Sequence, residues 1–243
     1  LETGLSSDPP MNWRLSKLDR LTLLSNSDSH SFWPWRVGRE ANVFELQRLR
    51  YREVLDAVRF KDKDRFKFTI ETDPAYGKYH WTGHRNCKVS LSPAEAIKLG
   101  NICPVCRKRL TKGVEQRVEE LADRPAGFKP QGVIGYIHLL PLSEIIATVL
   151  GVGSLYTRTV WSVYNRLVER FGDEYSVLIK ASNEALSEVV DDKIAEAIVR
   201  VREGRVTVVP GYDGVYGRLM IFEEDTEKSV SERVQQLNLT DFM

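Results

Sequence analysis

The sequence lacks any long hydrophobic run. No window of the 243 residues approaches the ~18 uninterrupted apolar residues of a membrane-spanning helix, and the N-terminus lacks the basic and then apolar pattern of a secretion signal. A large excess of one charge is also absent, because 35 Lys and Arg face 34 Asp and Glu. We therefore expect a cytoplasmic globular protein in which any contact with nucleic acid depends on local basic patches.

Cysteine and histidine are scarce, with three and four residues respectively. Two of the cysteines form the motif Cys-Pro-Val-Cys, which suits a metal site in a reducing compartment better than a disulfide framework. Hydrophobic residues make up 42% of the chain, enough for one large domain or two to three small ones. Because the chain begins Leu-Glu-Thr-Gly without a methionine, we expect a fragment of a longer protein.

An acid and an imidazole follow the strand-length hydrophobic run 21–24. If the backbone is extended there, Asp28 and His30 point to the same side, since side chains alternate along a strand. Barrels of alternating strands and helices place their chemistry at the carboxyl ends of strands, and Asp with His suits zinc, manganese or iron. The alternative is a capping Asp with a surface His.

Tryptophans and arginines surround this pair. Trp33 and Trp35 could stack on a nucleobase, or they could pack in the core. Arg36 and Arg39 indicate a rim that contacts phosphates. Asn26 is a candidate for reading a base edge through its amide. These residues make the segment a candidate DNA contact.

Four possible ligands of a structural metal come in two tight pairs. Cys103 and Cys106 form a C-x-x-C turn, and His84 and Cys87 form an H-x-x-C turn. Two such pairs provide the four ligands of a closed tetrahedral zinc site, which leaves no open position for a catalytic water. His80 is an alternative fourth ligand, and buried free cysteines without metal are the alternative to the whole site.

Basic side chains are dense around these ligands, which indicates phosphate contacts, with a solvated charged face as the alternative. We select Arg85 among them as a candidate DNA ligand. Downstream, the turn Gly151-Val152-Gly153-Ser154 separates two predicted helices. Its backbone N–H groups either contact a phosphate, or the turn is a tight helix connection with Ser154 as N-cap.

Apolar periodicity and turn residues predict the remaining elements. We expect a packed surface helix over 42–58, a strand over 66–71, helices over 92–100, 142–150, 156–171 and 192–203, a strand over 206–209, and a hairpin or looped strand pair over 210–224.

The tail after Glu224 is polar, and this composition predicts a flexible segment. Its end places Gln236, Leu239 and Phe242 on one face of a helical turn, a spacing that resembles the PCNA-interacting motif of DNA replication and repair enzymes. Met243 stands where a second aromatic residue usually closes that motif. The alternative is an ordinary polar tail.

The stretch ending SNSDSHSFWPWRVGREANVFEL resembles the last metal-binding motif of the PHP (polymerase and histidinol phosphatase) phosphoesterases, in the branch that contains archaeal endonuclease Q. The resemblance continues through both ligand pairs and through PGYDGVYG. It implies that Asp28 and His30 bind a multinuclear catalytic metal centre. Ser29 replaces the usual alanine, and the earlier motifs of the superfamily, including the opening His-x-His, are absent from this chain.

The resemblance also implies an α/β fold in four parts. The expected division is the C-terminal part of a PHP domain, a distorted β/α barrel, at 1–62, a small zinc-binding module at 63–124, a mainly helical DNA-binding domain with a terminal hairpin at 125–225, and a flexible tail with the PCNA-interacting motif at 226–243.

The function implied is that of a DNA repair endonuclease that incises 5′ to deaminated bases, such as uracil and hypoxanthine, or to abasic sites. Its cofactors would be structural zinc and divalent Zn, Mn or Mg in the catalytic centre, and its partners lesion-containing DNA and the PCNA clamp. We expect the chain alone to be inactive. The alternative is a non-catalytic zinc and helical DNA-binding adaptor recruited by the clamp. A small-molecule phosphoesterase fits the zinc module and the tail less well.

Overall fold

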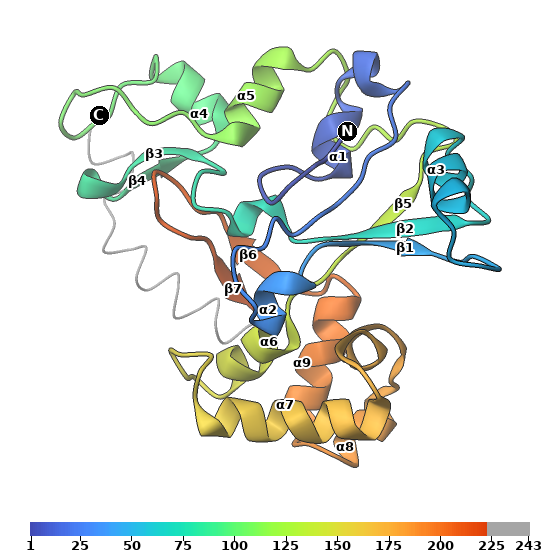
Figure 1. Cartoon of the computed structure of the whole chain (residues 1–243). Helices are drawn as coiled ribbons and strands as arrows, with labels where there is room; N and C mark the ends of the chain where they lie inside the picture. The colour runs from blue at the N-terminus through green and yellow to red at the C-terminus, as the bar shows by residue number, and fades with distance from the viewer. Residues whose placement is uncertain (223–243) are drawn as a thin grey trace.

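A computed structural model of the chain describes residues 1–222 and shows a mixed α/β protein of helices and small sheets (Figure 1). No helix within these residues has the length and apolar character needed to cross a membrane. The short elements are α1 (Pro9–Trp13), η1 (Ser16–Leu18), α2 (Pro34–Val37), η2 (Pro74–Tyr76), η3 (Arg85–Cys87) and, within the helical part, the π-helix η4 (Ser176–Lys180).

The largest sheet has three strands in the order β1-β2-β5. β1 (Ala41–Phe44) runs antiparallel to β2 (Phe66–Glu71), and β5 (Gly135–His138) runs parallel to β2. Helix α3 (Tyr51–Arg59) connects β1 to β2 and lies at one end of the sheet (Figure 1). The predicted division of the chain at 62/63 and at 124/125 therefore falls between strands that pair with one another.

Two local predictions in this region were wrong. The helix expected over 42–58 begins only at Tyr51, because Ala41–Phe44 pair with β2 as a strand. The strand expected over 21–24 is reduced to an isolated bridge between Leu24 and Glu2. Strand pairing is a contact between distant residues, so the local spacing of apolar side chains did not reveal either outcome.

A small module holds the candidate metal ligands. It contains the hairpin of β3 (Thr82–His84) and β4 (Val89–Leu91) and the helices α4 (Pro93–Lys98) and α5 (Val114–Leu121). Its hydrophobic core consists of the buried residues Leu91, Ala96, Cys103 and Leu110. The predicted start of α4 is confirmed, because Ser92 and Glu95 form a reciprocal capping box with Pro93 in the first turn.

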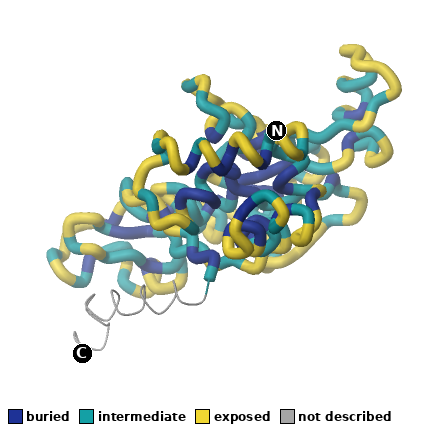
Figure 2. The backbone as a smooth tube through the Cα atoms, turned by 90° about the horizontal axis from the view of Figure 1, so that it is seen from below, coloured by how far each residue is buried: buried dark blue, intermediate teal, exposed yellow. Residues whose placement is uncertain are grey.

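The largest core lies among the C-terminal helices α6 (Leu142–Val149), α7 (Arg158–Phe171), α8 (Asn183–Ser187) and α9 (Asp192–Arg202). Figure 2 shows the buried segments gathered in the interior of the molecule. The N-cap of α7 is Thr157, whose hydroxyl accepts from the Val160 N–H at 3.3 Å, so the prediction of Ser154 as the cap was wrong. The glycine turn ends at Ser154, three residues before the N-cap Thr157.

The hairpin of β6 (Thr207–Val209) and β7 (Arg218–Met220) joins the helical part to the metal-ligand module. Its loop is PGYDGVYG, and the backbone of that loop pairs with the segment 75–81 through bonds such as Trp81 N–H to Gly211 O at 2.9 Å and Gly217 N–H to Tyr76 O at 3.0 Å. A Cβ on Gly211 would lie 2.3 Å from the Gly77 carbonyl oxygen. Close backbone packing therefore explains Gly211 and Gly217, whereas Gly214 has a φ of 87°.

Candidate metal sites and nucleic-acid interface

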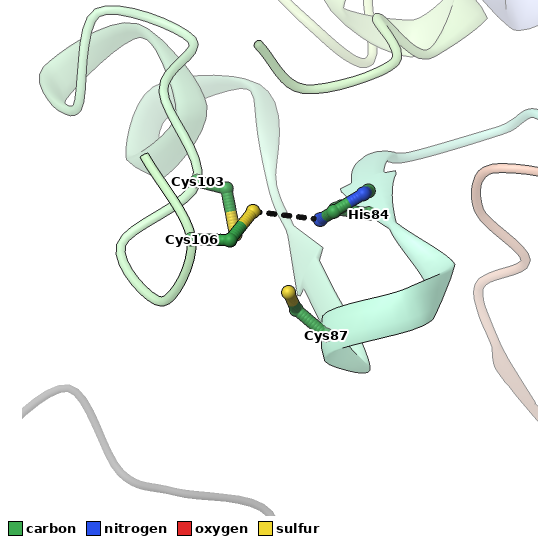
Figure 3. A group of neighbouring side chains, drawn as sticks. All are labelled: His84, Cys87, Cys103 and Cys106. Atoms are coloured by element: carbon green, nitrogen blue, oxygen red, sulfur yellow. Dashed lines mark hydrogen bonds between the residues drawn. The ribbon is translucent and has the colours of Figure 1, made fainter. Parts of the chain in front are cut away.

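The structure brings the two predicted ligand pairs together. One donor atom from each of His84, Cys87, Cys103 and Cys106 lies within 4.8 Å of all the others, and Figure 3 shows the four side chains converging. The Cys106 sulfur lies 3.3 Å from His84 Nδ1. His80 lies outside the cluster, with its Nε2 3.4 Å from a carboxylate oxygen of Glu115. The geometry thus selects His84 over His80.

Tight turns aim these ligands at one point. His84 ends β3, and η3 turns the chain so that Cys87 returns to the same side. In the second pair, the Cys103 N–H donates to the Lys108 carbonyl at 2.8 Å and the Arg107 N–H donates to the Cys103 carbonyl at 2.9 Å. Arg107 has a φ of 63°, the left-handed conformation that closes this turn.

The donor set fits a structural metal. Burial and the neighbouring thiols of Cys106 and Cys103 raise the pKa of the Cys87 thiol to about 11. Three thiolates cannot lie so close together without a cation, and thiolate sulfur with imidazole nitrogen is the donor set that zinc takes in closed sites. The cluster can therefore hold a metal ion.

Asp28 and His30 lie on the surface beside helix α2. The Ser27 hydroxyl donates to the Val37 carbonyl at 2.8 Å, which fixes this segment next to the end of α2. Asp28 has a φ of 44°, so the extended backbone expected here was wrong, and His30 Nδ1 lies 2.8 Å from the Asp28 carbonyl oxygen. Within residues 1–222 no third candidate ligand joins these two side chains.

The tryptophans form part of an aromatic cluster that ties this segment to the helical part. Trp33 stacks on Trp35 with ring centres 4.8 Å apart, and both contact Tyr156 edge to face. Trp35 is buried and Trp33 half-buried, whereas Phe32, whose ring is tilted against Trp33 with ring centres 4.8 Å apart, is 80% exposed. Sequence inspection passed over Phe32, the most accessible ring of the group.

Arg36 and Arg39 line a cavity of about 560 Å³. The other walls come from the segment 74–80, from α6 and the turn that follows it, and from the hairpin loop. The cavity therefore lies where segments from distant parts of the sequence meet. Val152 of the glycine turn is one of the lining residues. Binding sites commonly lie where separate structural parts meet.

The other predicted DNA contacts are Asn26, Arg85 and the glycine turn, which lie in different parts of the fold. The Asn26 side-chain oxygen accepts from the Asn42 amide at 3.1 Å, and the Arg85 N–H donates to Asp213 at 2.7 Å while its side chain is exposed. In the glycine turn, Gly151 has a φ of 63° and Gly153 has open space around it. Ser154 accepts from the Tyr156 N–H at 3.3 Å. The predicted clamp-binding residues Gln236, Leu239 and Phe242 lie outside the described residues.

Comparison with known family models finds a match for the helical part of the chain. Residues 141–205, which span α6 to α9, match the model of the MJ0043 C-terminal domain. The chain is 33% identical over 235 residues to the uncharacterised protein MJ0043 of Methanocaldococcus jannaschii and 33% identical over 220 residues to the uncharacterised protein YqxK of Bacillus subtilis.

Solved structures extend the similarity to nearly the whole chain. The crystal structure of the lesion-specific endonuclease PfuEndoQ from Pyrococcus furiosus matches 98% of the chain with a TM-score of 0.84 and 36% identity. A crystal structure of endonuclease Q with a 27-mer duplex carrying an abasic lesion at the active site matches 92% of it with a TM-score of 0.79 and 37% identity. The resemblance to endonuclease Q expected from the motifs is confirmed.

The chain is shorter than each of these relatives. It spans 29% of MJ0043 and 52% of YqxK, although the alignments cover 93% and 90% of the chain. It spans 58% and 56% of the two endonuclease Q chains. The similarity therefore concerns one portion of a larger protein.

Proposed function

We propose that this chain is a portion of a DNA repair endonuclease that incises a strand 5′ to a deaminated base or an abasic site. The observation that supports this most strongly is the structural match, at 37% identity, to an endonuclease Q bound to a duplex with an abasic lesion at its active site. The charge of the cavity walls agrees with a DNA ligand, since Arg36, Arg39 and Lys78 all line it.

In this proposal the chain is organised as the sequence predicted. Residues 1–62 are the C-terminal part of a PHP domain, 63–124 the zinc module, 125–225 the helical DNA-binding domain and 226–243 a tail that binds the PCNA clamp. Strand β2 pairs with β1 across the first limit and β5 pairs with β2 across the second, so we place both strands in the sheet of the PHP part.

Asp28 and His30 are the proposed ligands of the catalytic metals. Divalent metals at such a centre supply an activated water for phosphodiester hydrolysis. Two ligands are an incomplete set, and no third joins them among residues 1–222, so the remaining ligands must come from elsewhere in the full protein. We expect the 243-residue chain alone to be inactive for this reason.

The zinc cluster has a structural role in the proposal. Zinc held by His84, Cys87, Cys103 and Cys106 would have four protein ligands and no open position, so it would fix the turns that carry the nearby basic side chains. Exposed Arg85 lies directly after the first ligand, and with the backbone N–H groups of the glycine turn it is a proposed phosphate contact.

A non-catalytic DNA-binding adaptor is the second candidate. It is favoured by one observation: in the part of the chain that the structure describes, the zinc cluster is the only complete set of metal ligands. An adaptor would use the zinc module, the helical part and the clamp-binding tail without Asp28 and His30.

Incision of a labelled duplex that carries one abasic site or one deoxyuridine separates the two candidates. The assay compares the 243-residue chain with a form extended upstream through any His-x-His motif, each with Mn²⁺ or Mg²⁺. We expect cleavage by the extended form only, and a loss of at least about 100-fold in the Asp28→Asn and His30→Asn variants, as is typical when a metal ligand or its support is removed. Lesion-duplex binding without cleavage by either form would leave the adaptor.

A further inference from the structure

The hairpin loop PGYDGVYG carries one acidic side chain, Asp213, which contacts the metal-ligand module. Figure 1 shows the loop between β6 and β7 reaching the hairpin of β3 and β4. The Asp213 carboxylate accepts a hydrogen bond from the Arg85 N–H at 2.7 Å, and Arg85 directly follows the metal ligand His84. Arg85 is also the first residue of η3, the turn that ends at the second ligand, Cys87. Asp213 therefore holds the turn that lies between two ligands.

A second hydrogen bond joins the same carboxylate to Thr111. The backbone of Thr111 pairs with Gly83, the residue before His84, through N–H to O contacts of 2.9 and 3.0 Å. Burial raises the pKa of the Asp213 carboxyl, but the bonds from Thr111 and Arg85 and the charge of Arg85 lower it below its ordinary value. The group is therefore ionised at neutral pH, and hydrogen bonds to an ionised acceptor are the stronger kind.

The backbone holds Asp213 in position. Its φ is 42°, a left-handed conformation that Asp and Asn adopt more readily than most other side chains. The N–H of Gly214, the next residue, donates to the Lys78 carbonyl at 2.8 Å. On the other side, the ring of Tyr212 lies so close to Gly83 that a Cβ there would be 2.4 Å from it. The loop is thus fixed on both sides of the carboxylate.

The far end of the same loop forms part of the cavity wall. Tyr216 lines the cavity, together with Lys78 and Tyr79. The Lys78 ammonium lies 5.8 Å from the centre of the Tyr216 ring and 5.4 Å from that of Tyr79, within the range of cation–π attraction. One short loop therefore contacts the metal-ligand turn through Asp213 and the cavity through Tyr216.

We propose that Asp213 is a positioning residue of the metal cluster: it orients the turn that carries His84 and Cys87, and through it bound zinc fixes the loop at the edge of the cavity. Groups that orient metal ligands by hydrogen bonding typically contribute about 10–100-fold to metal affinity. The coupling is reciprocal, so if Asp213 strengthens zinc binding, zinc stabilises the docked loop by the same factor. The assignment needs only the metal cluster and goes beyond the proposed endonuclease function.

A purely structural role for Asp213 is the alternative, in which it fastens the loop to the module without affecting the metal. Substitution lowers stability in both cases, so unfolding experiments alone do not separate them. Zinc affinity does, because only a positioning role changes the free energy of metal binding.

The Asp213→Asn variant is the most direct test. Asparagine keeps the size of the side chain and tolerates the left-handed backbone, but it presents one acceptor oxygen where the carboxylate presents two. Zinc affinity is measured by competition with a chromophoric chelator, and Co²⁺ in place of zinc reports the ligand geometry through its absorption bands. We expect zinc binding about tenfold weaker in the variant and a changed Co²⁺ spectrum.

Amide hydrogen exchange measures the coupling to the loop. In the unchanged protein, we expect the amides of residues 207–220 to exchange faster when zinc is removed, because the turn that holds Asp213 loses its fixed position. In Asp213→Asn the same amides should exchange faster even with zinc bound, and removal of zinc should change their rates less than in the unchanged protein.

Asp173→Asn in the helical part is the matched control. Asp173 also accepts a backbone N–H and a hydroxyl, both from Ser176 and each at 2.8 Å, but it lies outside the metal-ligand module. The substitution there should lower stability comparably and leave zinc affinity within about twofold of the unchanged protein. Thermal unfolding with excess zinc confirms that each variant is folded.

Zinc affinity of Asp213→Asn within about twofold of the unchanged protein, or an equal loss in Asp173→Asn, would overturn the assignment. So would exchange of residues 207–220 that does not respond to zinc, or an unchanged protein that binds no zinc. Incision of lesion-containing DNA by the extended form is measured separately, so failure of this proposal is distinguishable from failure of the endonuclease proposal.

Discussion

At the scale of single residues, the molecule buries two acidic groups, Glu40 and Glu71, next to Thr72, which lines the cavity. Glu40 is 3% exposed and accepts hydrogen bonds from the Thr72 N–H at 3.3 Å and the Ser25 hydroxyl at 3.4 Å. Burial is the main cause that raises the pKa of the Glu40 carboxyl to about 7, and the charge of nearby Glu71 adds to it. Because the pKa of Glu40 is higher in the folded state than in the unfolded state, the free energy of unfolding depends on pH.

Glu40 should make the protein less stable as pH rises. Below its ordinary pKa of 4.5 the carboxyl is protonated in both states, and between 4.5 and about 7 only the unfolded state releases the proton, so the free energy of unfolding falls by up to about 3 kcal/mol. Urea unfolding at pH 5 and pH 8 measures this difference. Glu40→Gln should reduce it, with Glu71 supplying what remains, and an unchanged difference in the variant would contradict the argument.

The metal cluster makes a second prediction at this scale. Cys103 is fully buried at the centre of the small core, so Cys103→Ser should abolish binding of zinc, measured by atomic emission as one equivalent per chain in the unchanged protein. His80→Ala is the matched control, because His80 pairs with Glu115 outside the cluster. Loss of zinc in the His80 variant with retention in His84→Ala would reverse the ligand assignment.

At the scale of elements, the loop PGYDGVYG joins the hairpin to the metal-ligand module through backbone packing. Alanine at Gly211 would place a Cβ 2.3 Å from the Gly77 oxygen and 2.6 Å from the Gly217 nitrogen, and neither backbone atom can move freely. We expect Gly211→Ala to lower stability by about 1–3 kcal/mol. Gly153→Ala has nothing within 4 Å and should stay within about 0.5 kcal/mol, and equal effects in chemical denaturation would contradict this account.

The elements that the sequence predicted well are those with local signals. Ser92 and Pro93 mark the start of α4, and the helix expected over 192–203 is observed as Asp192–Arg202. The ligand pairs of the metal cluster were also recognisable, because each lies within one turn of chain. Strand β1 was missed because its partner lies more than twenty residues away, so nothing in its own sequence distinguishes it from the start of a helix.

The candidate site was only partly predictable for the same reason. Arg36 and Arg39 stood out beside the Asp28 and His30 motif, but Tyr76 and Glu144 carry no local signal. Glu144 looks in sequence like an ordinary acid in the first turn of a helix. Only the fold reveals that it shares a cavity with side chains over 100 residues away.

At the scale of the whole molecule, the arrangement gathers the functional groups around one region. The sheet carries the segment of Asp28 and His30, the helical part contributes Glu144, and the hairpin loop holds the metal-ligand module against the same cavity. A duplex lying across this region would meet Arg36 of α2, Arg39 just after that helix and basic side chains of the metal-ligand module together. This convergence is the feature of the fold on which the proposed binding of lesion-containing DNA depends.

The central claim is that the full protein cuts DNA at a lesion, and mapping the cut tests it most directly. The extended protein is incubated with Mn²⁺ and a 5′-labelled duplex that carries one abasic site, and the products are resolved at single-nucleotide length. We predict one product that ends at the phosphodiester bond 5′ to the lesion and none from the undamaged duplex. Equal cutting of both duplexes, or no product from either, would contradict the account.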